Sequence, residues 1–328
     1  MWETRAFHIK QNGEKKEITN YITNLTISGE YRDCSRSCNF GIVHGHGDKR
    51  TQQVQIQTGD HIRVIDGGNL LFHGVVWTKN KATETNDIDF TCQDFGIYLK
   101  KNKASYNFKN TTAMAITKQV CADFGIAVGS IAPAGGTVTR TFMGVPLYDI
   151  IMTAYTLADD KKYYIFFDGN QLYVHEKGKY EVPKLESGKN LLTANVSESL
   201  ANMVNRVRIY NKEDTYIEQI SNETDAQKYG YMTEILRISK DGEDYKKKAN
   251  EMLQGIEQKI SVTNFGNPAY RTGKKVHVIE PYTGLTGIFY IDADEHNWKN
   301  GIYTNKLTLN FKNLMDEKEG GTDGNERR

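Results

Sequence analysis

Alternating polar and apolar residues dominate the first hundred positions of the chain, and this period of two is typical of half-buried β-strands. The alternation predicts strands at residues 20–28, 37–43, 59–65, 70–77 and 87–92. The third and fourth strands flank Asp66-Gly67-Gly68-Asn69, a turn signal that predicts a β-hairpin. Because the strands are short and no helical pattern separates them, we expect residues 1–100 to form a first small β-barrel domain.

The hydrophobic period becomes helical after residue 100. Apolar residues recur at spacings of three and four in 112–124 and again in 146–158, which predicts two amphipathic helices. Residues 163–175 then form the clearest predicted hairpin of the chain, with its turn at 168–170. Two helices and a hairpin predict a small α+β domain at 101–185.

Strand patterns return beyond residue 185. Strands are predicted at 205–210, 275–279, 287–291 and 303–309. We therefore expect a second small β-barrel domain composed of 186–215 and 259–314. The intervening residues 216–258 are predicted to be an insertion. A polar surface stretch is predicted at 211–227, which overlaps the start of the insertion, and a helix is predicted at 241–258.

A short sequence pattern occurs twice. Residues 58–64 and 272–278 both read Thr-Gly-charged-X-(Ile/Val)-X-Val. Each copy is followed by a glycine-containing apolar strand (71–76 and 285–289) and then by an alternating strand (88–90 and 307–309). Because three successive strands agree in order, we interpret the two β regions as a duplication. The predicted fold is mainly β with an α+β insertion: two similar small β-barrels, a small α+β domain and an inserted helix.

The duplication has a consequence for symmetry. Three subunits with two similar modules each would place six similar modules around a ring. Such a ring can seat a sixfold partner on one face and a threefold partner on the other. A contractile phage-like tail needs this adaptor, because its hexameric tube must end on a trimeric spike.

The chain also resembles a known family, the baseplate hub proteins of contractile phage tails and tailocins, and more narrowly the XkdQ-type, late-control-D-like tail hubs. The resembling residues extend over about 25–312. They are Thr58-Gly59-Asp60, residues 72–76, residues 146–151 with the 168–170 turn, Asn205-Arg206-Val207, Tyr229-Gly230, residues 266–273, and Tyr290-Ile291 before His296.

The resemblance implies a homotrimeric structural hub with two tube-forming β-barrels. It implies contacts with the tail tube protein, the central spike protein and other baseplate proteins. It also implies assembly in the bacterial cytoplasm and residence in the baseplate of a virion or tail-like particle. Some hubs of this family are fused to peptidoglycan hydrolases. This chain is expected to stop at the hub and to leave cell-wall cutting to a partner.

The amino-acid composition argues against several other classes of function. Lys and Arg number 42 and Asp and Glu 41, a formal charge of +1, which argues against coating of nucleic acid or of an anionic membrane. The uncharged stretch at 124–139 is too short to span a bilayer, and the start lacks the pattern of a secretory signal. Four Cys in 328 residues predict reduced thiols rather than a disulfide framework. Residues 315–328 are charged and lack apolar anchors, so we expect a disordered polar tail.

One group of residues has the ligand types of a zinc site. Cys34 and Cys38 are followed by His44 and His46, and two thiolates with two imidazoles can close a tetrahedron. However, Cys38 lies in an alternating strand, where a small buried side chain is expected, and the spacing matches no finger pattern. We therefore expect no metal, and the absence of phosphate-loop and dinucleotide fingerprints predicts no cofactor.

Two alternative functions stay open at this point. Residues 292–296 (Asp-Ala-Asp-Glu-His) gather acids and an imidazole at a predicted strand end. A β-rich peptidoglycan hydrolase could use them as general acid and base, although acids at strand ends are usually just exposed. A cell-wall carbohydrate-binding tail module could use Trp2, Trp77 or Trp298 as stacking platforms. The leading expectation is a non-enzymatic assembly protein without catalytic residues.

Overall fold

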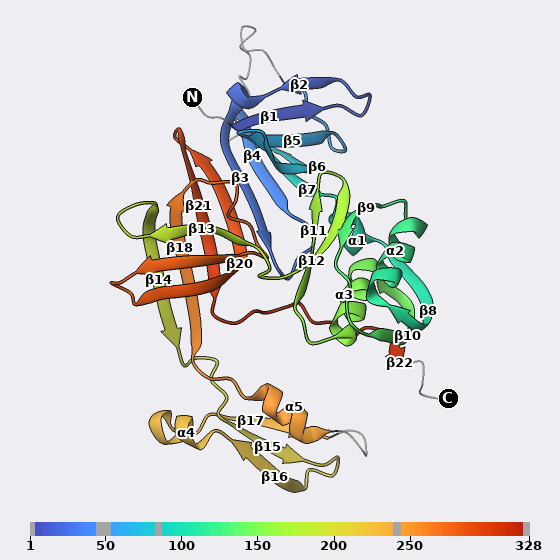
Figure 1. The fold of residues 1–328 in the computed structure, drawn as a ribbon, viewed down its shortest axis with the longest axis vertical. Helices are drawn as coiled ribbons and strands as arrows, with labels where there is room; N and C mark the ends of the chain where they lie inside the picture. The colour runs from blue at the N-terminus through green and yellow to red at the C-terminus, as the bar shows by residue number, and fades with distance from the viewer. Residues whose placement is uncertain (1–3, 44–53, 83–86, 239–243, 324–328) are drawn as a thin grey trace. The chain divides into compact units, whose positions relative to one another are not determined.

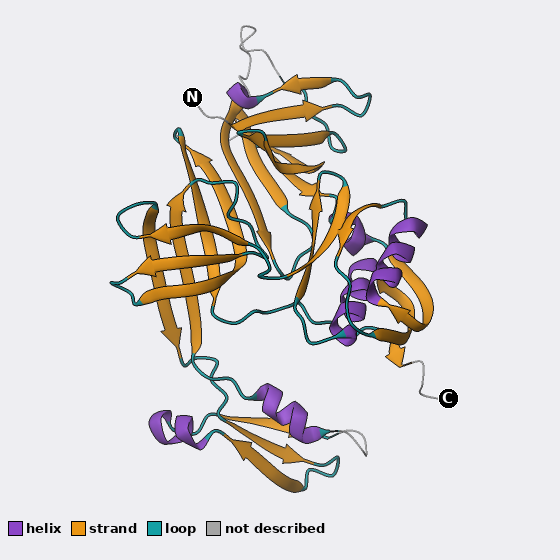
Figure 2. Ribbon diagram, in the orientation of Figure 1, coloured by secondary structure: helices purple, strands orange, loops and turns teal. Residues whose placement is uncertain are grey.

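A computed structural model describes residues 4–43, 54–82, 87–238 and 244–323 of the 328-residue chain (Figure 1). The chain divides into two compact units, residues 1–194 together with 261–328, and residues 195–260. Figure 2 shows that strands dominate the chain. The prediction of a mainly β fold with an α+β insertion is confirmed.

The first β module contains seven strands. They are β1 (Thr4–Ile9), β2 (Lys15–Glu17), β3 (Ile22–Glu30), β4 (Ser37–Val43), β5 (His61–Asp66), β6 (Asn69–Lys81) and β7 (Asp87–Asp94), and a 3-10 turn at Thr19–Tyr21 precedes β3. Their order in the sheet is β3-β4-β7-β6-β5-β1-β2. The β5–β6 pair is the hairpin predicted at the Asp66 turn, where Gly67 and Gly68 both have positive φ. Apolar residues that alternate along these strands, among them Ile27, Phe40 and Phe90, form the module's core.

The second β module contains β13 (Glu181–Glu186), β14 (Leu191–Ser199), β18 (Glu257–Phe265), β19 (Lys275–Glu280), β20 (Leu285–Lys299) and β21 (Ile302–Asn310). Its strands follow the order β14-β18-β21-β20, with β19 beside β20 and β13 beside β19. This order repeats β3-β4-β7-β6-β5-β1 of the first module, and β2 has no counterpart among the described strands of the second. The outermost strands differ, because β1 is antiparallel to β5 whereas β13 is parallel to β19.

The repeat extends to single backbone positions. Gly59 and Gly273 have φ of +91° and +86°, a conformation that favours glycine, and donate their N–H groups to Val76 O and Ile291 O, each at 3.0 Å. A β-bulge follows each acceptor, at Trp77 in β6 and at Asp292 in β20. The predicted duplication is therefore present. The glycines of the second strand are not equivalent, however, since Gly74 faces Ile62 whereas Gly287 faces Val278, two residues further along β19.

The two β modules share one sheet, which contains 13 strands among the described residues. The sequence predicts two barrels but gives no sign of this continuity. It arises because β20 is long enough to pair with β19 in its first half and with β3 of the first module in its second half.

The α+β region lies between the modules in sequence. It contains α1 (Ile97–Lys101), β8 (Lys103–Thr112), α2 (Ala113–Asp123), β9 (Ala127–Ile131), β10 (Thr137–Pro146), α3 (Leu147–Ala158), β11 (Tyr163–Asp168) and β12 (Gln171–Glu176). The two predicted helices and the predicted hairpin are confirmed. Thr112 caps α2 by accepting the N–H of Ala115 at 3.3 Å, and Gly125 follows its end with φ of +63°. The inward faces of α2 and α3 pack on the β11–β12 hairpin in one apolar core.

The expectation of a disordered polar tail at 315–328 is wrong for residues 315–323. Met315 is buried in the α+β core, and the N–H of Lys318 donates to Thr156 Oγ1 of α3 at 3.1 Å. A short strand, β22 (Thr322–Asp323), then pairs with β10. Backbone groups make most of these contacts, so side-chain polarity gave no sign of them. Residues 324–328 lie outside the described residues.

The 195–260 unit is larger than the predicted insertion. It contains β15 (Arg206–Tyr210), which was assigned to the second barrel, with β16 (Tyr216–Ser221), α4 (Glu223–Tyr229), β17 (Thr233–Arg237) and α5 (Tyr245–Met252). The interpretation of 211–227 as a surface excursion is wrong, because β16 and α4 occupy much of it. The helix predicted at 241–258 ends at Met252, since Gln254 pairs with Val204 in a β-bridge, and its first residues (241–243) are not described. Among the described residues, no helix is long and apolar enough to cross a bilayer.

Candidate functional site

The point where β20 passes from one β module to the other is the most distinctive polar region of the chain. After the Asp292 bulge, residues Ala293–Trp298 pair with Leu25–Glu30 of β3 in antiparallel register. Asp292, Asp294 and His296 all carry buried side chains there, with exposures of 7%, 2% and 1%. We call this region the module junction. A buried polar cluster of this kind has to be fully paired to be stable.

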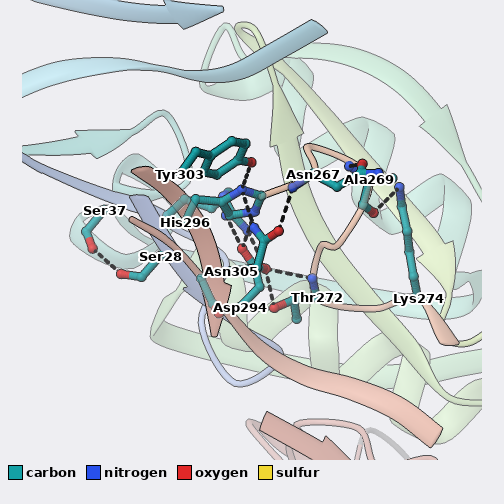
Figure 3. Close-up of polar contacts among 12 residues, drawn as sticks. Ser28, Ser37, Asn267, Ala269, Thr272, Lys274, Asp294, His296, Tyr303 and Asn305 are labelled. Carbon is teal, nitrogen blue, oxygen red and sulfur yellow. Dashed lines mark hydrogen bonds and ion pairs between the residues drawn. The ribbon is translucent and has the colours of Figure 1, made fainter. Parts of the chain in front are cut away.

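Asp294 and Arg36 form the central ion pair of the module junction. The Arg36 guanidinium donates from Nη1 to Asp294 Oδ1 at 2.9 Å and from Nη2 to Oδ2, a bidentate arrangement. Thr272 donates its N–H and its hydroxyl to the same carboxylate, at 2.6 and 2.7 Å (Figure 3). Gly29 lies opposite Asp294, and Arg36 crosses directly over it, since a Cβ at Gly29 would lie 2.5 Å from Arg36 Nη1. The glycine therefore makes room for the arginine.

The electrostatics of Asp294 follow from these contacts. Burial alone would raise the pKa of its carboxyl group, but the Arg36 guanidinium and the donated hydrogen bonds hold that pKa well below its usual range. Asp294 is therefore ionised in the folded state. Removing one member of such a buried pair leaves the other unpaired and costs about 3–5 kcal/mol of stability.

His296 connects this ion pair to an asparagine network (Figure 3). Asn305 Oδ1 accepts the backbone N–H of Asn267 at 2.7 Å, which orients the amide so that its Nδ2 faces His296 Nδ1 at 2.9 Å. His296 Nδ1 is therefore an acceptor, and it also lies 2.6 Å from the Tyr303 hydroxyl. The ring proton then belongs on Nε2, which is 3.1 Å from Asp294 Oδ2. Burial lowers the pKa of His296 below 6.5 although Asp294 opposes that shift, so the ring is neutral.

A second buried pair ties the module junction to the α+β region. Lys177 follows β12, is 2% exposed, and donates from Nζ to Asp292 Oδ1 and to Leu314 O, the latter at 2.9 Å. Asn310 donates to the other carboxylate oxygen of Asp292 at 3.1 Å. The Lys177 ammonium also lies 4.1 Å from the centre of the Tyr31 ring. Lys177, which follows β12, thus connects Asp292 of β20 with the backbone at Leu314 and the ring of Tyr31.

The acids at 292–296 are not where the sequence placed them. They lie in the middle of β20 rather than at a strand end, and Asp292 and Asp294 are buried rather than exposed. Arg36, Thr272, Lys177 and Asn310 occupy their oxygens. A general acid or base needs a carboxyl group that a substrate can reach, and the oxygens of these two are already engaged in holding elements together.

Cys34 and Cys38, two of the four residues weighed as zinc ligands, lie in different cores. Cys34 belongs to the α+β core and Cys38 to the core of the first β module, and burial raises the pKa of both thiols. His44 and His46 lie outside the described residues. Within the described part of the chain, no group of three or more His, Cys, Asp or Glu has the geometry to hold a metal ion.

The two tryptophans among the described residues, Trp77 and Trp298, lie in different environments. Trp298 is buried, stacks on Tyr303 with ring centres 4.2 Å apart, and donates from Nε1 to Thr4 Oγ1 at 2.8 Å. Trp77 is 39% exposed, and Trp2 is not among the described residues. Nothing in the sequence marked Arg36, Lys177 or Asn305 as members of this cluster. Asn267 and Thr272 lie in the 266–273 segment, which was singled out only because it carries part of the family resemblance.

Known proteins share this architecture. The prophage MuSo2 43 kDa tail protein from Shewanella oneidensis aligns with a TM-score of 0.74 at 15% identity, over 94% of this chain and 97% of that one. The tail protein from Neisseria meningitidis MC58 aligns with a TM-score of 0.67 at 14% identity, over 93% and 96% of the two chains. The chain therefore has the fold of phage tail proteins.

Sequence comparison gives the family. Phage-like element PBSX protein XkdQ of Bacillus subtilis (strain 168) is 27% identical over 314 residues, which cover 89% of this chain and 93% of the relative. The sequence profile of the YQBQ-like family matches residues 25–310, and the chain belongs to that family. The resemblance to phage tail proteins that the sequence suggested is confirmed, and the chain is a phage-tail-like structural protein.

Proposed function

We propose that this protein is the structural hub of a contractile tail baseplate. Three copies form a ring of six β modules, which receives the hexameric tail tube on one face and a trimeric central spike on the other. Other baseplate proteins bind the outside of the ring. The hub has no catalytic role, and the 292–296 segment serves assembly and stability.

One observation supports the ring more than any other. The two β modules of one chain are topological repeats, and they are already joined edge to edge through β20 and β3. The β20–β3 pairing uses one edge of each module, and the equivalent edges, in the second half of β6 and in β14, have no such partner strand among the described residues. Joining those edges between copies closes a ring and removes the exposed strand edges, which would otherwise favour aggregation.

The buried ion pairs support a structural role for the module junction. The Arg36–Asp294 pair joins the two β modules directly and favours one angle between them, while the Lys177–Asp292 pair joins the second module to the α+β region. A ring requires such a fixed angle between successive modules. Ring contacts of this obligate kind bury on the order of 2,000 Å² or more.

Light scattering on the purified chain tests the proposal. The native particle should have three times the mass of the chain, and it should bind separately purified tube and spike proteins. A control with the tube protein alone shows whether the tube assembles without the hub. A stable monomer that binds neither protein at micromolar concentrations would contradict the hub function.

A further inference from the structure

The second half of β6 has one unpaired edge. β6 pairs with β7 along Gly74–Lys81, whereas β5 covers its other edge only up to Val75. Beyond the Trp77 bulge, no described strand pairs with that second edge. At the equivalent place in the second β module, β20 is paired with β3. Residues Thr78–Lys81 of β6 therefore correspond to Ala293–His296 of β20 but lack a strand beside them.

The missing strand has a counterpart in the repeat. β3 lies next to β4, and β14 occupies the same place next to β18, at the end of the sheet order. Both strands contain nine residues, and both are least exposed at the same two inner positions, Leu25 and Ile27 in β3 and Ala194 and Val196 in β14. β14 thus offers the kind of edge that β20 meets in β3.

We propose that β6 of one copy pairs with β14 of the next copy in the register that β20 and β3 show within the chain. This inference rests on the proposed ring and names its inter-chain contact. Asp294 lies opposite Gly29 within the chain, so the same register puts Lys79 opposite Glu198 of the neighbouring copy. Thr78 then faces Ser199, and Lys81 faces Val196.

The charges fit this pairing. Within the chain the carboxylate is on the long strand (Asp294), and the cation, Arg36, reaches it across Gly29. Between copies the signs are exchanged, with the cation on the long strand (Lys79) and the carboxylate directly opposite (Glu198). Glu198 is exposed, and Gln258 holds its carboxylate at 2.7 Å. Lys79 donates to Ile56 O, in the loop equivalent to the one from which Thr272 donates to Asp294.

The exchange of signs also excludes wrong partners. If β20 met β14, Asp294 would face Glu198, and if β6 met β3, Lys79 would face Gly29, over which the Arg36 guanidinium lies. Both mispairings place like charges together, which destabilises cross-strand contacts. The charge pattern therefore permits only alternating first and second modules, the order that a closed ring of three chains requires.

A charge exchange tests the pairing. Lys79→Glu and Glu198→Lys are prepared singly and together, and the concentration at which half of the chains are assembled is measured by light scattering. Each single variant should raise that concentration roughly tenfold, because three contacts per ring are affected, and the double variant should restore it to within about threefold. Lys118→Glu, an exposed position on α2, changes the net charge equally and should leave assembly unchanged.

The outcomes separate this pairing from the hub proposal. If the wild-type chain trimerises and both single variants assemble equally well, or if the double variant fails to recover, the Lys79–Glu198 contact is wrong while the ring stands. A wild-type chain that stays monomeric overturns both. Unfolding curves of each variant identify any loss that comes from misfolding. The Glu198→Lys variant is expected to fold like the wild type, because the Glu198 side chain is exposed.

Discussion

The second halves of β20 and β6 follow the same backbone course with opposite side-chain environments. Each begins after a bulge, at Asp292 or Trp77, and each has a long partner strand on one side. Asp292, Asp294 and His296 of β20 are buried within their own chain, whereas β6 ends in the exposed residues Asn80 and Lys81. The difference shows that two topologically equivalent strands can keep the same backbone geometry and still have different side-chain environments.

The largest expected difference between the two strands is at their central charged residue. Asp294→Ala leaves Arg36 buried without its partner and should lower the free energy of unfolding by about 3–5 kcal/mol. Lys79→Ala, at the equivalent position of β6, should cost less than about 1 kcal/mol in the same urea titration, since its side chain is only partly buried. Equal losses at the two positions would mean that the two environments do not differ as described.

A smaller effect is expected opposite these residues. Gly29→Ala places a Cβ against Arg36 and should cost about 1–3 kcal/mol, because the arginine has to move away from Asp294. Glu198→Ala, the equivalent change in β14, should alter the free energy of unfolding by no more than about 0.5 kcal/mol. A Gly29→Ala protein as stable as the wild type would show that Arg36 can reach Asp294 by another path.

The smallest expected effect depends on pH. His296 is neutral in the folded chain and has a lowered pKa, so the unfolded chain binds its proton first as pH falls below 6.5. Folding stability should therefore decrease by about 1 kcal/mol between pH 7 and pH 5.5 through this residue. His73, whose pKa burial lowers to about 4, contributes in the same window. The difference between wild type and His296→Gln isolates His296, and an unchanged pH profile in the variant would contradict the lowered pKa of His296 in the folded chain.

Sequence reasoning succeeded where the pattern is local. The β11–β12 hairpin has strong β-formers on both sides of the 168–170 turn, and α2 and α3 have apolar faces that pack on one core. It failed in 211–227, because β16 and α4 there have many exposed positions and only a weak apolar pattern. The Asn222 cap, which accepts the N–H of Asp225, was the one local sign of α4.

The module junction could not be predicted in the same way. Asp294 was noticed because it stands near His296, but Arg36 is 258 positions away and lies in an otherwise ordinary polar loop. Only the pairing of β20 with β3 brings the two together, and no local pattern encodes that pairing. The sequence therefore identified Asp292 and Asp294, but it predicted exposed side chains where the structure has buried ones.

Residues 200–256, which make up most of the 195–260 unit, connect β14 to β18, whereas the first module has only a short connection from β3 to β4. Only one of the two duplicated hairpins thus carries extra protein. In a trimer, a protein that recognises this unit would find three equivalent sites, while one that recognises the repeated strands would find six. The number of copies bound per trimer, three or six, would then depend on which part of the chain a partner recognises.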